Sequence, residues 1–235
     1  MPIDYSDIKK PIYNPFNPNQ FNNVLNSIQP FHNKLISRYF AKKWTELLYL
    51  CDQDFIGKDL DYPFENYSLM GALDETVKIS VTFNIEKTLR ILFQQNASQT
   101  IFDLSLFGEF HQYSQRTPIT FKYEPGSSFI NMPIIILHSE VAYERTFVID
   151  GNHRVSFAKD HGFKHLSGFV IDDNFLIDNN LFADIWSLNY FLFSIDLNTL
   201  LEQKKNTKNI FLFSLFHEYS FFKKNTFLST FLKDV

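Results

Sequence analysis

A strand, a tight turn and a short helix follow one another in residues 147–159. Their sequence is Phe147-Val148-Ile149-Asp150-Gly151-Asn152-His153-Arg154-Val155-Ser156-Phe157-Ala158-Lys159. The β-branched and aromatic run at 147–149 predicts a strand that is buried on both faces. Asp150 and Gly151 end this strand, because Gly tolerates a positive φ and Asp can bond its own backbone. Asn152 is suited to cap the helix that follows, so these residues predict a strand–turn–helix unit.

The residues beyond this helix predict where it ends and what comes next. Gly162 is the residue type that usually follows a helix C-terminus, so the helix is expected to end near it. Residues 166–171 are a second apolar run with strand character. Asp172 and Asp173 close that strand with two acids.

Two basic side chains, His153 and Arg154, stand in the first turn of the predicted helix. A helix N-terminus leaves backbone N–H groups without partners and carries partial positive charge. A cation is unfavourable there unless an anion lies between it and the helix, so a phosphate or carboxylate ligand would explain the pattern. A turn whose basic side chains are only solvated explains the same residues, and spacing alone leaves both interpretations open.

The ordered segments of this region resemble the ParB/sulfiredoxin superfamily, whose members carry a Gly-x-His-Arg or Gly-Glu-Arg-Arg signature at such a turn. Residues 132–137 (Met-Pro-Ile-Ile-Ile-Leu) are similar to the superfamily's Pro-Ile strand, which pairs with the signature strand as a hairpin. The resemblance covers about residues 131–172 and leaves the rest of the chain unassigned. It implies an α+β protein with a small mixed sheet around this core and helices before and after it.

The resemblance implies that the turn binds the phosphates of a nucleoside triphosphate, ATP or CTP, with Mg²⁺. Gly151, Asn152 and His153 would cradle the phosphate, and Arg154 would pair with it, because a planar guanidinium can bond two phosphate oxygens. Asp150, His153 and Arg154 would then carry phosphoryl transfer or hydrolysis, Asp150 as a metal ligand or base.

Two branches of the superfamily fit poorly. Sulfiredoxins carry a catalytic Cys where this chain has Asn152, and the single Cys51 is distant in sequence, so sulfinic-acid repair is not expected. Partition proteins add a basic helix-turn-helix domain, and no such helix follows residue 172.

A magnesium site is one interpretation of Asp150 and Asp172. If the strand at 166–171 runs beside that at 147–149, both strand ends open on the same side of the sheet. Asp172 and Asp173 could then hold Mg²⁺ together with phosphate oxygens, with Asp150 as a further candidate ligand. A polar turn at Asp172 and Asp173 is the alternative interpretation.

Composition limits the other classes of function. The chain has 235 residues, a formal net charge of −4 and one Cys. This charge gives no general electrostatic case for nucleic-acid binding, and one Cys excludes a disulfide framework or a Cys-rich zinc site. No run reaches the ~18 apolar residues needed to span a bilayer, and the first residues do not form a secretory signal. The cytoplasm is the expected compartment, without a membrane partner.

The remaining segments are assigned by pattern. We expect three regions: 1–70 as an arm and a helix, 71–175 as the core, and 176–235 as a helical region. The expected elements are an irregular arm (1–29), a helix starting at Pro30 (30–51), a loop (52–70), a strand (77–83), a helix capped by Asn84 (85–95), a second helix (100–111), a short strand (118–123) and three C-terminal helices (181–194, 197–205, 210–224).

Two other functions stay open. The C-terminal helices are rich in Phe on all sides, which is typical of burial or of a partner surface. The protein could therefore be a non-catalytic interaction or scaffold protein, or a homo-oligomer. A ParB-like nuclease is the third hypothesis, with the acids at 150, 172 and 173 as metal ligands, but the acidic net charge counts against it. The nucleotide enzyme ranks first.

Overall fold

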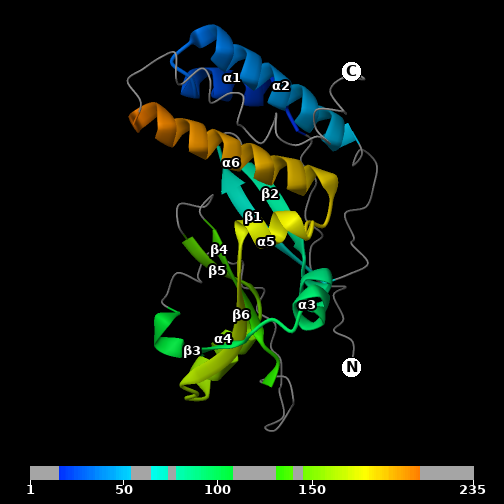
Figure 1. The fold of residues 1–235 in the computed structure, drawn as a ribbon, viewed down its shortest axis with the longest axis vertical. Coiled ribbons are helices and arrows are strands. Elements are labelled where there is room, and N and C mark those ends of the chain that lie inside the picture. The colour runs from blue at the N-terminus through cyan, green and yellow to red at the C-terminus, as the bar shows by residue number, and fades with distance from the viewer. Residues whose placement is uncertain (1–15, 54–64, 74–77, 108–130, 140–144, 207–235) are drawn as a thin grey trace. The chain divides into compact units, whose positions relative to one another are not determined.

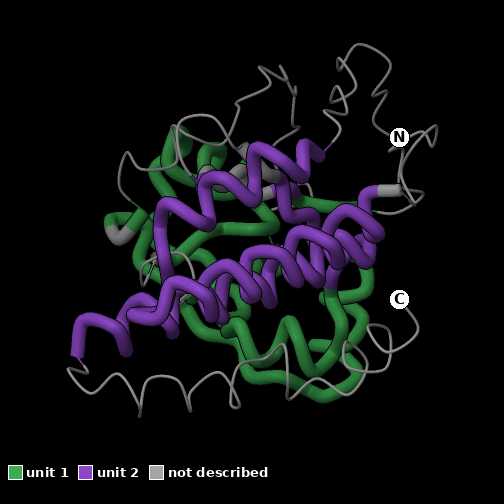
Figure 2. Tube along the Cα trace, turned by 90° about the horizontal axis from the view of Figure 1, so that it is seen from above, with its two compact units in different colours: residues 1–11, 63–67, 84–181 green, residues 12–62, 68–83, 182–235 purple. Residues whose placement is uncertain are grey.

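The chain folds as an α+β protein, with six α-helices and two small sheets in the described part (Figure 1). The structure is a computed structural model that describes residues 16–53, 65–73, 78–107, 131–139 and 145–206. These residues form two compact units (Figure 2). Unit 1 comprises 65–67 and the described residues of 84–181, and unit 2 comprises 16–53, the described residues of 68–83, and 182–206.

Unit 1 is built on a four-stranded mixed sheet. Its strand order is β3 (Thr100–Asp103), β6 (His165–Asp172), β4 (Ile134–Ser139) and β5 (Arg145–Asp150). β4 runs antiparallel to β5, with Ile136 opposite Val148, and parallel to β6, with Ile136 opposite Val170. β3 completes the sheet by running antiparallel to β6. The hairpin expected between 132–137 and the strand at 147–149 is therefore confirmed.

One face of this sheet is covered by α4 (Asn152–Asp160) and by the 3₁₀ turn η1 (Leu104–Leu106). Alternate residues of a strand point to the same face, so every second position of β4 contributes to this core. The core cluster comprises Leu104, Phe107, Ile134, Ile136, Val148, Val155, Ala158 and Leu166. Because Val155 and Ala158 anchor α4 on the sheet, the position of its N-terminus is set by apolar packing.

Two further helices of unit 1 are α3 (Ile85–Gln94) and α5 (Asp173–Asp178). The ring of Phe93 on α3 meets the buried Phe169 of β6 edge-on, with centroids 5.6 Å apart. α5 packs near β4 and β6. The expected helix at 85–95 and its Asn84 cap are confirmed, since the Asn84 side chain accepts a hydrogen bond from the Lys87 N–H at 2.8 Å.

Unit 2 contains α1 (Pro18–Ile28), α2 (Lys34–Gln53) and α6 (Ile185–Asn206) around an aromatic core. The fully buried Phe193 of α6 contacts the rings of Phe21 and Trp44 at centroid distances of 5.1 and 5.5 Å. The strands β1 (Asn66–Ala72) and β2 (Lys78–Asn84) form a two-stranded sheet, which confirms the expected strand at 77–83. The Thr82 carbonyl accepts from the Ala183 N–H at 2.8 Å, which ties β2 to the segment before α6.

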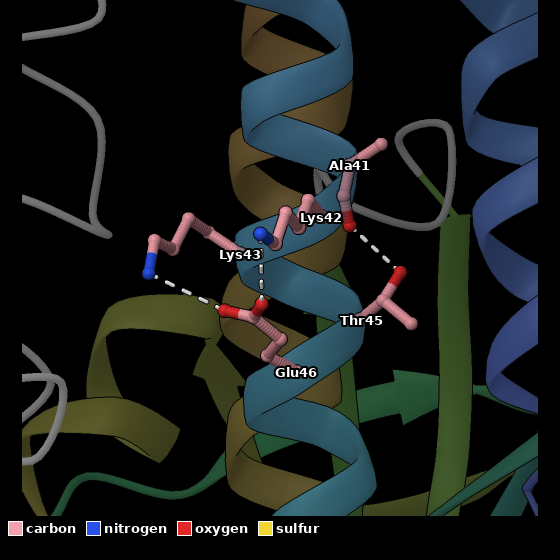
Figure 3. Close-up of polar contacts among 5 residues, drawn as sticks. All are labelled: Ala41, Lys42, Lys43, Thr45 and Glu46. Carbon is pink, nitrogen blue, oxygen red and sulfur yellow. Dashed lines mark hydrogen bonds and ion pairs between the residues drawn. The ribbon is translucent and has the colours of Figure 1, made fainter. Parts of the chain in front are cut away.

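The outer side of α2 is polar (Figure 3). Lys42 and Lys43 both pair with Glu46, at 3.7 and 3.3 Å, and the side chain of Lys42 is 68% exposed. On the buried side of the same helix, the Thr45 hydroxyl donates to the Ala41 carbonyl at 2.7 Å (Figure 3). Exposed pairs of this kind contribute about 0–1 kcal/mol, so these lysines belong to a solvated helix face.

Two expectations for the N-terminal region are wrong. Residues 18–28 are the helix α1 and not an irregular arm, with the Asn17 side chain accepting the Gln20 N–H at 3.1 Å and Pro18 in the first turn. The long helix begins at Lys34 and not at Pro30. The Asn33 side chain accepts the Leu35 N–H at 2.8 Å, which ends the loop three residues after Pro30.

Three further assignments need correction. Residues 66–70 belong to β1 and not to a loop, and residues 100–103 form β3 and not the start of a helix. α6 is one helix where two were expected at 181–194 and 197–205, because the buried Asp196 does not interrupt it. The expected elements at 118–123 and 210–224 lie outside the described residues. No helix in the described ranges combines the length and apolar character that crossing a membrane requires.

Candidate functional site

The turn between β5 and α4 is built around Gly151. Gly151 occupies the N-cap position with φ 92° and ψ 17°, in the left-handed region that favours glycine. The sequence placed Asn152 at the cap, and this is wrong, because Asn152 is the first helical residue. Its side-chain N–H donates to the Val148 carbonyl at 2.9 Å and so ties α4 back to β5.

The N-terminus of α4 differs from those of α1, α3 and α5. In those helices the side chain of Asn17, Asn84 or Asp172 accepts a hydrogen bond from the first turn. Gly151 has no side chain and supplies no such bond. No N-cap side chain therefore shields the positive end of the α4 dipole.

Arg154 folds back onto the turn and pairs with Asp150. Its Nη2 lies 2.7 Å from the Asp150 Oδ2, and the two side chains are 5% and 11% exposed. An anion is expected near Arg154, because a cation in a first helical turn opposes the helix dipole. The structure places Asp150 in that role, so Arg154 does not point outward to an external phosphate.

The space beside Gly151 is already filled. A Cβ built on Gly151 would lie 2.5 Å from the Ile134 Cγ2 and 2.9 Å from both the Nε and the Nη2 of Arg154. Glycine is therefore required here by close packing as well as by its φ. The turn is held between a core side chain of β4 and the guanidinium of α4.

His153 is the exposed basic residue of this turn, and Asn152 is half-buried beside it. The N–H groups of a first helical turn have no intrahelical acceptor, so they are natural donors to an anion. The groups that this arrangement can offer to an anion are the N–H donors of the first turn and the imidazole of the exposed His153.

Glu65 is a neighbour of this site that the sequence does not reveal. It comes just before β1, and its carbonyl accepts the Ile85 N–H at 2.9 Å at the start of α3. Glu65 is an exposed residue, but partial desolvation of its carboxyl group raises the pKa, the carboxylates of Asp150 and Glu86 raise it further, and Arg154 opposes them. Residue 65 lay in an expected loop, and no local pattern links it to residues 150–154.

The proposed sharing of Mg²⁺ by Asp150 and Asp172 is wrong in its geometric premise, because β6 pairs with β4 and not with β5. Asp150 is opposite Ile135, whereas Asp172 is opposite His138. Three residues along a strand span ~10 Å, so the two carboxylates stand at different ends of the sheet. Asp172 instead caps α5, accepting the Phe175 N–H at 2.8 Å. Within the described part of the chain, no three His, Cys, Asp or Glu side chains are grouped to hold a metal ion.

The chain matches no protein-family model, no curated protein and no solved structure.

Proposed function

We propose that the protein has a ParB/sulfiredoxin-like core that binds a nucleoside triphosphate with Mg²⁺ at the β5–Gly151–α4 turn and transfers or hydrolyses its terminal phosphate. The observation that carries this proposal is the N-terminus of α4, which begins on a glycine without a capping side chain and has the exposed His153 in its first turn. Such a terminus favours phosphate through both its N–H donors and its dipole.

The order of elements supports the same proposal. β4 and β5 form a hairpin, α4 follows at the turn, and β6 returns parallel to β4. This is the succession of Pro-Ile strand, signature strand, helix and strand that the sequence resembles. All of these elements belong to unit 1.

The chemistry proposed for the turn is mainly electrostatic. Phosphoryl transfer spreads negative charge over the phosphate oxygens, and preorganised donors that face this charge lower the barrier. The first-turn N–H groups and His153 would serve in this way. Mg²⁺ commonly retains several waters and binds phosphate oxygens, so the ion would be carried chiefly by the nucleotide.

A thermal-shift screen tests nucleotide binding. ATP, CTP, GTP and UTP are added with and without Mg²⁺, and a ligand at 100 times its dissociation constant should stabilise the protein by about 2.7 kcal/mol, a shift of a few degrees. The diagnostic variant is His153→Glu. A carboxylate in the first turn suits the helix dipole by about 0.3–1 kcal/mol, so the fold should persist, but it should repel phosphate.

The matched control is His161→Glu, which makes the same change at the other end of α4, where His161 is also exposed. The nucleotide shift, measured against each variant's own unliganded melting temperature, should survive in this control and be lost in His153→Glu. An equal shift in all three proteins would remove the turn from the binding site. Release of inorganic phosphate from the bound nucleotide then tests whether the site is catalytic.

A non-catalytic interaction protein is the second candidate, and the Asp150–Arg154 pair favours it. The Arg154 Nη2 lies 2.7 Å from the Asp150 Oδ2, so the two charges of the turn neutralise each other without a ligand. A turn with a purely structural role would need the same pairing. Flat melting curves with every nucleotide, together with a stable oligomer or co-purifying protein in size-exclusion chromatography, would support this candidate. The separation of Asp150 from Asp172 along the sheet disfavours the nuclease.

A further inference from the structure

We infer that Arg154 is a positioning residue, which holds Asp150 and Gly151 in place and does not itself contact the phosphate. This inference deepens the proposed function and depends on it for its ligand. It reverses the role that the sequence resemblance implies for Arg154.

The burial of the guanidinium is the first argument. Arg154 is 5% exposed, and its Nη2 is 2.7 Å from the Asp150 Oδ2. To reach a ligand outside the turn, Arg154 would have to leave a carboxylate that is only 11% exposed. Removing one partner of a buried ion pair is strongly unfavourable, because the remaining charge is neither solvated nor compensated.

The contact with Gly151 is the second argument. The guanidinium lies so close to this glycine that a Cβ there would be 2.9 Å from its Nε and Nη2. Arg154 and Ile134 together fill the space that a side chain at position 151 would need. In this position Arg154 keeps Gly151 at its positive φ and fixes the place where α4 begins.

The charge of Asp150 gives Arg154 an indirect effect on phosphate. Asp150 immediately precedes the N-cap of α4, where an uncompensated carboxylate would repel an incoming phosphate. Pairing with Arg154 cancels this charge. Arg154 thus supports anion binding through Asp150, and the effect should disappear when both charges are removed together.

A double-mutant cycle separates this role from direct contact. The variants are Arg154→Gln, Asp150→Asn and the double variant, and the probe is inorganic tripolyphosphate with Mg²⁺, titrated by calorimetry. Arg154→Gln should raise the dissociation constant about tenfold or more, because it exposes the phosphate to the charge of Asp150. The double variant should return to within about threefold of wild type. A double variant that binds as weakly as Arg154→Gln would overturn the inference, since it would mean that the phosphate needs the guanidinium itself.

Amide hydrogen exchange measures, without any ligand, how firmly the start of α4 is held. The Val155 N–H donates the first hydrogen bond of α4, to the Gly151 carbonyl at 2.9 Å. Its exchange should be slow in wild type and faster in Arg154→Gln and in the double variant, because both lack the guanidinium that packs on Gly151. If wild type binds neither tripolyphosphate nor any nucleotide, the proposed function is refuted. The exchange rates of Val155 still test whether Arg154 positions the turn. Unchanged Val155 exchange in Arg154→Gln would refute the positioning role.

Discussion

Replacing Gly151 with alanine should destabilise unit 1 much more than the same change at Gly162. Both glycines have positive φ, 92° and 73°, so both replacements carry a backbone cost. A left-handed conformation costs an L-residue about 1–2 kcal/mol, and the stiffer unfolded chain returns about 0.4–1 kcal/mol. At Gly162 a Cβ meets nothing within 4 Å, so the expected loss there is only about 0.5–1 kcal/mol.

Gly151 adds a steric cost to this backbone cost. The new Cβ would lie 2.5 Å from the Cγ2 of Ile134, which is fully buried on β4. Because Ile134 is held between neighbouring strands, it cannot withdraw freely, and overpacking of this kind costs about 1–3 kcal/mol. The total expected for Gly151→Ala is therefore about 2–4 kcal/mol.

Urea denaturation followed by far-ultraviolet circular dichroism measures both losses, with Gly162→Ala as the matched control. Trp44 and Trp186 are the two tryptophans of the chain and both lie in unit 2, so their fluorescence gives a separate reading of that unit. Equal losses for the two variants would show that Ile134 and Arg154 move aside at little cost. The account of Gly151 as a tightly packed turn would then be wrong.

Three further changes test other parts of the structure. Arg154→Ala should cost about 3–5 kcal/mol, because it leaves Asp150 buried without its partner, and an unchanged urea midpoint would contradict the buried pair. Phe193→Ala should also lower the free energy of unfolding by about 3–5 kcal/mol, since it empties the aromatic centre of unit 2. Urea denaturation followed by tryptophan fluorescence measures this loss, and a loss below about 1 kcal/mol would mean that neighbouring side chains fill the cavity easily. Glu65→Gln should stabilise the protein at pH 7 but not at about pH 4. A carboxyl group whose pKa is raised in the folded protein favours folding only while it is protonated, and this contribution is lost as pH rises through the folded pKa. The urea midpoints of wild type and Glu65→Gln, measured at both pH values, test this prediction. If the variant differs from wild type by the same amount at both pH values, the carboxyl group of Glu65 does not cause a pH-dependent loss of stability.

The elements with a local signal were predictable from the sequence. Asn84 follows an alternating strand and precedes a helical apolar pattern, and the structure has that strand, cap and helix. Asn17 and Pro18 carried an equally good start signal for α1, but the nearby prolines favoured an arm. At residues 100–103 the apolar spacing suited a helix, whereas pairing with β6 selects a strand. Tertiary pairing of this kind overrides local propensity.

The site was predictable only in its backbone. The turn at Gly151 and the helix that starts directly after it follow from the residue types. The direction of the Arg154 side chain does not, because it depends on the half-buried Asp150, which lies four residues earlier and belongs to the preceding strand. Asp172 was misplaced for a similar reason, since the partner of β6 is decided by the whole sheet. Glu65 comes from a distant segment and has no local signal at all.

The division of the units along the chain has a consequence for biosynthesis. The ribosome releases residues 84–181 in one uninterrupted passage, so the sheet of unit 1 can assemble as soon as they emerge. Unit 2 has no such opportunity, because α1 and α2 are made early and Phe193, the ring against which Phe21 and Trp44 pack, is made late. Until α6 is synthesised, the aromatic side chains of α1 and α2 that pack against Phe193 therefore stay exposed to solvent. Exposed apolar surface of this kind is prone to aggregation, so the yield of folded protein should depend on chaperones that bind the first two helices before α6 is made.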